Sequence, residues 1–220
     1  MGAVPDHGEA ARVVPTANRF DRREHPLNPD PIWPSVILET DRLVLRAFTA
    51  DDVDDVYRAA NDPVTQRWVP LPEPGRRPYT RSDAEEWCTV IAPHMRASGD
   101  GQQWAVVIRD TGEFAGAFGL VRTLWRARTT EIGYWTAPWV RGKGVATEAV
   151  AVIARWALLE QSFERVEIKA ATANTASRRV AEKTGFLYEG TERSAMPLHE
   201  GRVDLAVYGL VRADLTHSDS

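Results

Sequence analysis

A glycine-rich turn at residues 141–149, Arg-Gly-Lys-Gly-Val-Ala-Thr-Glu-Ala, constrains this chain more than any other stretch. The preceding residues 130–136 are rich in β-branched and aromatic side chains, which predicts a strand, and residues 145–159 place apolar side chains at helical spacing. The N–H groups and the macrodipole at the start of a helix stabilise an anion, and Gly142 and Gly144 let a phosphate approach the backbone closely. The pattern therefore predicts a strand, a turn and a helix that together bind a pyrophosphate.

Two better-known phosphate-binding motifs do not fit this turn. A P-loop requires Gly-Lys followed by Ser or Thr, but Lys143 is followed by Gly144. A dinucleotide-binding turn has a third glycine where this chain has Thr147, and it follows its strand directly, whereas Pro138 and Trp139 intervene here. A turn that only connects a strand to a helix remains the alternative to an anion site.

Composition favours a compact enzyme domain. The 220 residues are 43% hydrophobic and 26% charged, which is enough for about one domain with a sizeable core. The net charge of −4 argues against a general nucleic-acid binder. The chain has no apolar run of membrane-spanning length and its N-terminus lacks a secretory pattern, so we expect a cytoplasmic protein. Cys88 is the only cysteine, which excludes an intrachain disulfide and a cysteine-cluster metal site, and we expect no metal.

The chain divides into three expected parts. Residues 1–34 contain six prolines and few apolar side chains, which predicts a flexible arm that folding does not need. Residues 35–215 form the single expected domain, and 216–220 a tail. The expected elements are a strand at 36–47, a helix from Thr49 to Ala60, a short helix from Asp62, a helix opened by the capping-box pattern Ser82–Glu85, a hairpin of 103–109 and 113–122, a strand at 130–136, a helix at 145–159 and a strand at 163–170. We therefore expect a mixed α/β (α+β) fold with helices on both faces of one sheet.

The turn resembles the Arg/Gln-x-x-Gly-x-Gly/Ala signature of the GNAT superfamily of acyl-CoA-dependent N-acetyltransferases, whose three defining positions are occupied by Arg141, Gly144 and Ala146. A second block, residues 174–186, is similar to the Asn-x-x-Ser helix ending in Gly-Phe of the branch that acetylates the N-termini of ribosomal proteins. Residues 201–208 resemble the closing strand of the family. The resemblance covers residues 36–214.

The resemblance implies a mostly antiparallel sheet with a splayed cleft between its fourth and fifth strands, here 130–136 and 163–170. Acetyl-CoA would lie in that cleft, and a bulge near Gly133 would supply the free strand edge. The residues expected to bind it are Tyr134, Trp135 and Thr136 along the strand, Arg141, Gly142, Lys143, Gly144, Val145, Ala146 and Thr147 in the turn, and Asn174 on the pantetheine arm.

Acetyl transfer to an amine needs a base for the amine and a proton for the departing thiolate. Glu131 is the favoured base because it lies at the start of the strand that carries the thioester site; a salt bridge at the strand end is the alternative interpretation. Asp204 in the closing strand is a second candidate, at the acceptor side. Many family members place a Tyr seven residues after the helix Asn, but Ala181 is found here, so the resemblance implies Ser177 as the acid.

The acceptor is left open by the sequence. Trp68 precedes a proline-rich loop and Trp125 lies in an arginine-rich connection, and an exposed Trp at either place could stack on a substrate. A peptide N-terminus and a small-molecule amine are the expected acceptors, with no nucleic-acid or membrane partner and with a homodimer as one expected assembly. An inactive acyl-CoA sensor and a nucleotide-dependent oxidoreductase are the alternative functions.

Overall fold

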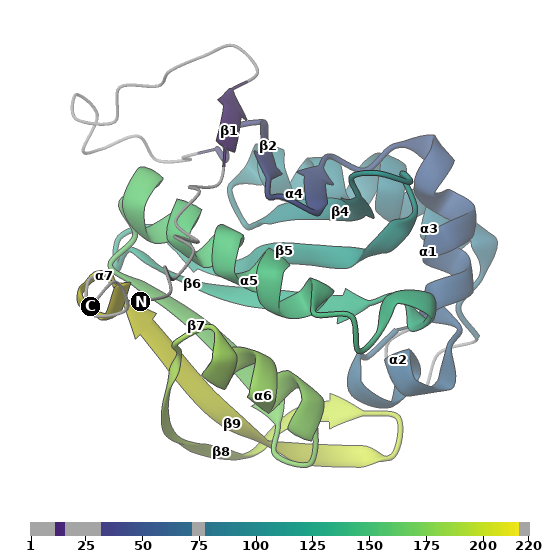
Figure 1. Ribbon diagram of the computed structural model, residues 1–220. Helices are drawn as coiled ribbons and strands as arrows, with labels where there is room; N and C mark the ends of the chain where they lie inside the picture. The colour runs from purple at the N-terminus through teal and green to yellow at the C-terminus, as the bar shows by residue number, and fades with distance from the viewer. Residues whose placement is uncertain (1–11, 16–31, 72–77, 216–220) are drawn as a thin grey trace, which may run out of the picture.

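The computed structural model describes residues 12–15, 32–71 and 78–215, which form one nine-stranded sheet with helices around it (Figure 1). The strands are β1 (Arg12–Pro15), β2 (Val36–Glu39), β3 (Leu43–Arg46), β4 (Gln102–Ile108), β5 (Phe114–Leu124), β6 (Thr129–Thr136), β7 (Arg165–Ala171), β8 (Leu187–Leu198) and β9 (Gly201–Val211). The helices and helical turns are η1 (Ala50–Asp52), α1 (Val53–Ala60), α2 (Pro63–Trp68), α3 (Arg81–Glu86), η2 (Trp87–Ile91), α4 (Ala92–Ser98), η3 (Pro138–Val140), α5 (Val145–Arg155), η4 (Trp156–Glu160), α6 (Thr175–Lys183) and α7 (Arg212–Leu215).

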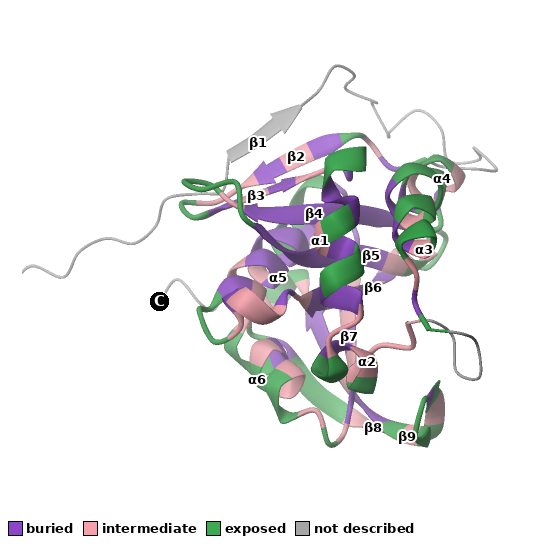
Figure 2. Cartoon of the chain, turned by 90° about the vertical axis from the view of Figure 1, so that its right-hand side faces the viewer, coloured by how far each residue is buried: buried purple, intermediate pink, exposed green. Residues whose placement is uncertain are grey.

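The strand order is β1-β2-β3-β4-β5-β6-β7-β9-β8. In the described part of the chain, seven of the eight pairings are antiparallel, and only β6 and β7 run parallel. The helices α5 and α6 lie on one side of the sheet, and α3 and α4 lie on the other (Figure 2). The predicted mixed fold, a mostly antiparallel sheet with helices on both faces, is confirmed.

The parallel pair separates soon after it forms. Backbone pairing between β6 and β7 joins three residue pairs, from Thr129 with Arg165 to Glu131 with Glu167, although β6 continues to Thr136. The predicted splay between these two strands is therefore present. The predicted bulge at Gly133 is wrong, because Gly133 lies opposite Gly119 in an unbroken register with β5. The free edge of β6 arises because β7 diverges from it.

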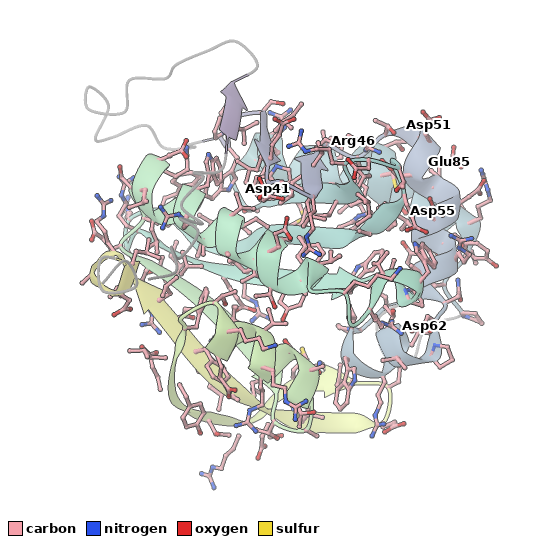
Figure 3. The ribbon with its side chains drawn as sticks, in the orientation of Figure 1. Asp41, Arg46, Asp51, Asp55, Asp62 and Glu85 are labelled. Carbon is pink, nitrogen blue, oxygen red and sulfur yellow. The ribbon has the colours of Figure 1, made fainter. Side chains whose placement is uncertain are left out.

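The expected single strand over residues 36–47 is also wrong, because β2 and β3 form a hairpin in which Leu38 pairs with Leu45. The chain turns at Asp41, which Figure 3 labels. Thr40 closes the turn: its amide donates to the carbonyl of Leu43 at 3.0 Å, and its hydroxyl accepts the amide of Leu43 at 2.9 Å. The apolar periodicity of residues 36–47 indicated one continuous strand, but a local side-chain hydrogen bond stabilises a turn within it.

Helix starts follow the predicted capping chemistry, with one shift along the chain. Asp62 caps α2 by accepting the amide of Thr65 at 2.9 Å, as expected. The capping box of α3 uses Thr80 and Asp83 instead of the predicted Ser82–Glu85, with the amide of Thr80 donating to the Asp83 carboxylate at 2.7 Å. The helix therefore begins at Arg81 and continues through η2 into α4.

The predicted flexible arm, residues 1–34, includes residues that belong to the folded domain. Residues 1–11 and 16–31 lie outside the described residues, but Arg12–Pro15 pair with β2 as strand β1, and Trp33 is fully buried. The Trp33 ring lies 4.6 Å from Trp125 and 5.2 Å from Phe163 between ring centroids. Burial of one large aromatic side chain outweighs the local signal of the neighbouring prolines.

We predict that Trp33→Ala lowers the free energy of unfolding by about 3–5 kcal/mol, because it removes a fully buried indole from an aromatic cluster. The neighbouring Ile32 is 54% exposed, so Ile32→Ala is the matched control and should change stability by less than about 0.5 kcal/mol. Urea denaturation measures both. Equal, small effects would mean that residue 33 is not part of the core.

Candidate active site

A cleft of about 450 Å³ opens where β6 and β7 separate. Its walls come from these two strands, from α2, from the start of α5 with the turn before it, from α6 and from β8. Most residues predicted to bind acetyl-CoA line it, namely Tyr134, Trp135, Thr136, Arg141, Gly142, Gly144, Val145, Ala146, Thr147 and Asn174. Lys143 is the exception: its side chain is exposed outside the lining, and its amide donates to the carbonyl of Val140. The amide of Lys143 is thus already engaged within the turn.

The glycine-rich turn has the geometry that its sequence predicts. Gly142 has φ +77° and Gly144 has φ +80°, in the left-handed region that side chains rarely adopt. A Cβ at Gly142 would meet no atom within 4 Å. The helix α5 begins at Val145, and no side chain of the described residues caps it by a hydrogen bond. Its first-turn amides therefore lie beside the cleft without a protein cap.

Arg42 holds this turn from outside the cleft. Its Nη1 donates to the carbonyl of Lys143 at 3.1 Å, and its Nε donates to Glu148 in the first turn of α5 at 2.7 Å. Thr40 donates to the same carboxylate. These residues come from the β2–β3 turn, about a hundred positions earlier in the chain. The sequence interpretation missed Arg42 because it placed residue 42 inside a continuous strand.

The Arg141 side chain points away from the start of α5 and toward α2. Its Nη2 donates to Asp62 Oδ2 at 2.5 Å and to Thr65 Oγ1 at 2.8 Å. Burial alone would raise the pKa of Asp62, but the hydrogen bonds from Arg141 and from the Thr65 backbone outweigh it and lower that pKa. Arg141 therefore joins the turn to the cap of α2.

Glu131 lies at the point where β6 and β7 separate, and its side chain is 13% exposed. Its carboxylate pairs with Arg122 of β5 at 3.1 Å. Burial raises the pKa of Glu131 above the usual carboxyl range, and the positive charges of Arg122 and Lys169 oppose that rise. Lys169, which also lines the cleft, is held by Glu192 at 2.7 Å. The salt bridge that was the alternative interpretation of Glu131 is present, within the cleft lining.

Ser177 meets a phenol that the sequence interpretation did not consider. The hydroxyl of Tyr134 lies 2.9 Å from Ser177 Oγ, and its ring stacks on Phe118 with centroids 5.2 Å apart. Burial raises the pKa of Tyr134 to about 12, so the phenol is protonated at neutral pH. Asn174 Oδ1 caps α6 by accepting the amide of Ser177 at 3.1 Å. Because side chains alternate along a strand, Tyr134 and Glu131 reach the cleft from opposite faces of the sheet.

A family model described as an acetyltransferase (GNAT) domain matches residues 42–187, which is more than half of the chain. The chain belongs to the GNAT acetyltransferase family. It is an acetyl-CoA-dependent N-acetyltransferase by that membership.

Relatives and solved structures agree with this family. The N-acetyltransferase YoaA of Bacillus subtilis (strain 168) is 29% identical over 177 residues, which cover 80% of this chain and 97% of YoaA. The ribosomal-protein-serine acetyltransferase of Escherichia coli (strain K12) is 29% identical over 84 residues, covering 38% of this chain and 47% of that protein. The structure of RimL, a ribosomal L7/L12 alpha-N-protein acetyltransferase in complex with coenzyme A, superimposes with a TM-score of 0.70 at 19% identity, over 82% of this chain and 98% of RimL.

Three side chains expected at the acceptor side of this GNAT domain have different locations. Trp68 of α2 lines the cleft, with Arg67 over its ring at 4.8 Å. Trp125 does not, because its ring is packed on Trp33 and its Nε1 donates to the carbonyl of Gly99 at 2.9 Å. Asp204 also lies outside the lining, where it accepts the amide of Ser194 at 2.7 Å. Neither Trp125 nor Asp204 lines this cleft, and their contacts with a substrate stay predictions.

The lining of the GNAT cleft has more positive than negative side chains. Its cations are Arg141, Lys169, Arg179 and Lys183, and Glu131 is its one acidic residue among the described residues. The chain as a whole carries a net charge of −4. The cleft is thus a locally basic region of an acidic protein, as a site for a polyanion requires.

Within the described ranges, no helix is long and apolar enough to cross a membrane.

We predict that Arg122→Met shifts the acidic limb of the pH–kcat/KM profile to higher pH. The charge of Arg122 lowers the pKa of Glu131, so without it the carboxylate stays protonated to a higher pH and activity falls earlier as pH decreases. Arg126→Met, which removes an exposed arginine from the turn between β5 and β6, is the control and should leave the limb in place.

Glu131→Gln should lose that limb and recover activity only as the pH approaches the pKa of the amine itself. An unchanged profile in Glu131→Gln would remove Glu131 from proton transfer.

Proposed function

We propose that this GNAT enzyme holds the diphosphate of acetyl-CoA at the start of α5 and acetylates a primary amine that enters from the α2 side of the cleft. The observation that carries the proposal is the coincidence of two anion-binding features: the uncapped start of α5, and the cations Arg179 and Lys183 in the cleft lining, which remain after Arg141 pairs with Asp62 and Lys169 with Glu192. Both stabilise phosphate groups, one through amides and dipole and the other through charge. Backbone amides of the turn and the side chains of Arg179 and Lys183 fit the phosphates of coenzyme A.

Glu131 is the proposed base. An amine attacks the thioester carbonyl only after losing its proton, and a buried carboxylate with a raised pKa is a better proton acceptor near neutral pH than an exposed one. The charges of Arg122 and Lys169 favour the ionised form of Glu131 and oppose the effect of burial on its pKa. The base is thereby ready to accept the proton directly or through one water molecule.

Ser177 and Tyr134 are the proposed acid. As the new amide bond forms and the carbon–sulfur bond breaks, Ser177 Oγ donates a proton to the thiolate. The Tyr134 phenol, 2.9 Å from that oxygen, donates its own proton to the serine oxygen in the same step, and the phenolate that remains regains a proton from solvent. Asn174 supports the arrangement by fixing the first turn of α6, and its amide nitrogen is proposed to contact the pantetheine arm.

The acceptor end of the cleft is proposed to take an amine next to an apolar group. Val64, Trp68 and Val69 form one side of this end, and Met196 of β8 contributes to the other. A peptide N-terminus and a small-molecule amine both satisfy this chemistry. The RimL and Escherichia coli relatives carry names that refer to ribosomal proteins, which favours a peptide N-terminus. Acetyl transfer to a panel of N-terminal peptides and small amines, with and without an apolar group beside the amine, tests the choice.

Binding of coenzyme A at the turn is tested by Gly142→Asp. Position 142 has room for the side chain, so the carboxylate should repel the diphosphate and weaken binding by at least ~2 kcal/mol, or about 30-fold. Gly112→Asp is the matched control, because Gly112 also has positive φ and open space but lies in the β4–β5 turn. Titration calorimetry with coenzyme A measures both affinities, and equal affinities in the two folded variants would overturn the phosphate site.

The two groups of the proposed acid are separated by a pair of conservative variants. Ser177→Ala should lower kcat by about 10²-fold with little change in either KM, because its contact is made mainly in the transition state. Tyr134→Phe keeps the stacked ring and removes only the phenol hydroxyl, so it should lower kcat by a smaller factor in the same way. If Tyr134→Phe raised KM for acetyl-CoA at unchanged kcat, the phenol would be a binding group and not part of the acid.

A further inference from the structure

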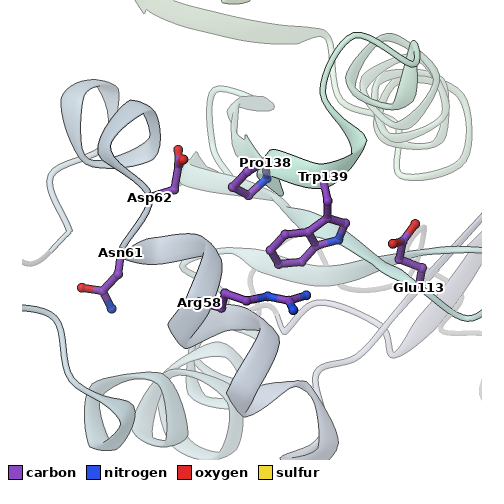
Figure 4. A pocket seen from close by; sticks show the side chains of 6 residues that line it. All are labelled: Arg58, Asn61, Asp62, Glu113, Pro138 and Trp139. Carbon is purple, nitrogen blue, oxygen red and sulfur yellow. The ribbon is translucent and has the colours of Figure 1, made fainter.

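The short helix α2 forms one wall of the acceptor end. It has six residues, and a helix of that length has no independent stability in water. Val64, Thr65 and Trp68 line the cleft on its inner side. A second, open hollow of about 480 Å³ lies at the N-terminal end of α2, where its cap residue Asp62 lines it together with Arg58, Asn61, Glu113, Pro138 and Trp139 (Figure 4). The position of α2 therefore depends on a few specific contacts.

Two contacts, one from α2 and its cap and one from α1, lead to the segment that precedes α5. Arg141 donates to Asp62 and to Thr65, as described above, and its side chain is 30% exposed while that of Asp62 is 19% exposed. Arg58 of α1 lies 3.8 Å from the ring centroid of Trp139, beside Pro138 in Figure 4. Residues 138–141 thus join α1 and α2 to the glycine-rich turn.

We infer that Arg141 and Asp62 are a positioning pair: they couple the turn that holds coenzyme A to the helix that walls the acceptor site. The inference rests on the proposed binding of acetyl-CoA at this turn. A ligand on the amides at the start of α5 restricts the backbone of the turn that follows Arg141, and Arg141 transmits that restriction to the cap of α2. By thermodynamic reciprocity, an ordered α2 then favours the cosubstrate as much as the cosubstrate favours an ordered α2.

The test compares hydrogen–deuterium exchange of the α2 amides in the full-length protein with and without saturating coenzyme A. Wild type should exchange several-fold more slowly at residues 64–69 when coenzyme A is bound. Asp62→Asn keeps a capping side chain but removes the charge that Arg141 contacts. It should lose the slowing in α2, bind coenzyme A more weakly by about the same several-fold factor in calorimetry, and show a KM about ten-fold higher for the best amine of the acceptor panel at similar kcat.

Two further variants make the result specific. Thr65→Val removes the second acceptor of Arg141 without changing the charge or shape of α2. It should reduce the slowing of α2 exchange that coenzyme A causes, as Asp62→Asn does. It therefore tests the inference independently if Asp62→Asn is poorly folded. Asp54→Asn is the matched control, since it removes an exposed carboxylate of α1 that pairs with Arg81, and it should behave as wild type.

Equal slowing of α2 in wild type, Asp62→Asn and Thr65→Val, with coenzyme A bound in each, would overturn this inference alone. Failure of the wild type to bind coenzyme A would overturn the proposed function and this inference with it.

Discussion

The separation of β6 from β7 is the constraint on which the rest of the site depends. Parallel strands must be joined by a crossover, and here the crossover contains α5, which begins after η3 and the glycine-rich turn that follow the end of β6. Pairing stops at Glu131, which leaves residues 132–136 without a strand partner on the side of β7. If β6 and β7 had stayed paired along their whole length, the backbone groups of residues 132–136 would be hydrogen-bonded to β7. Because the hydrogen-bond pairing of β6 with β7 ends early, a cleft opens there, and the uncapped start of α5 and the helix α6 both line it.

That separation also places the chemical groups. Glu131 occupies one face of β6 and Tyr134 the other, and a gap through the sheet lets both reach the same cavity. Burial raises the pKa of both side chains, but with different consequences: the carboxyl becomes a stronger base, and the phenol stays protonated. An acidic chain with a basic cleft adds an electrostatic preference for a polyanion at this one place.

Much of the fold was predictable because its signals are local. Strand periodicity, the capping residue Asp62 and the glycines of the turn all act within a few residues of themselves, and each has the predicted conformation. Two failures were local, the turn at Thr40 and the capping box at Thr80, and the others involve contacts between distant segments. Trp125 looked exposed in its arginine-rich connection, yet Trp33, about ninety positions earlier, packs on it. Arg42 could not be found at all, because nothing near residue 42 shows that the β2–β3 turn reaches α5.

The sequence by itself determined the family, the order of the elements and the glycine-rich turn, because backbone geometry and periodicity are properties of short segments. Only the tertiary structure decided what the side chains do. It joined Arg141 to Asp62, brought Tyr134 to Ser177 and enclosed Glu131 between Arg122 and Lys169. Each of these pairs comes from different elements, or from strands whose register is set by the whole sheet. Their distances therefore depend on packing across the molecule and not on spacing along the chain.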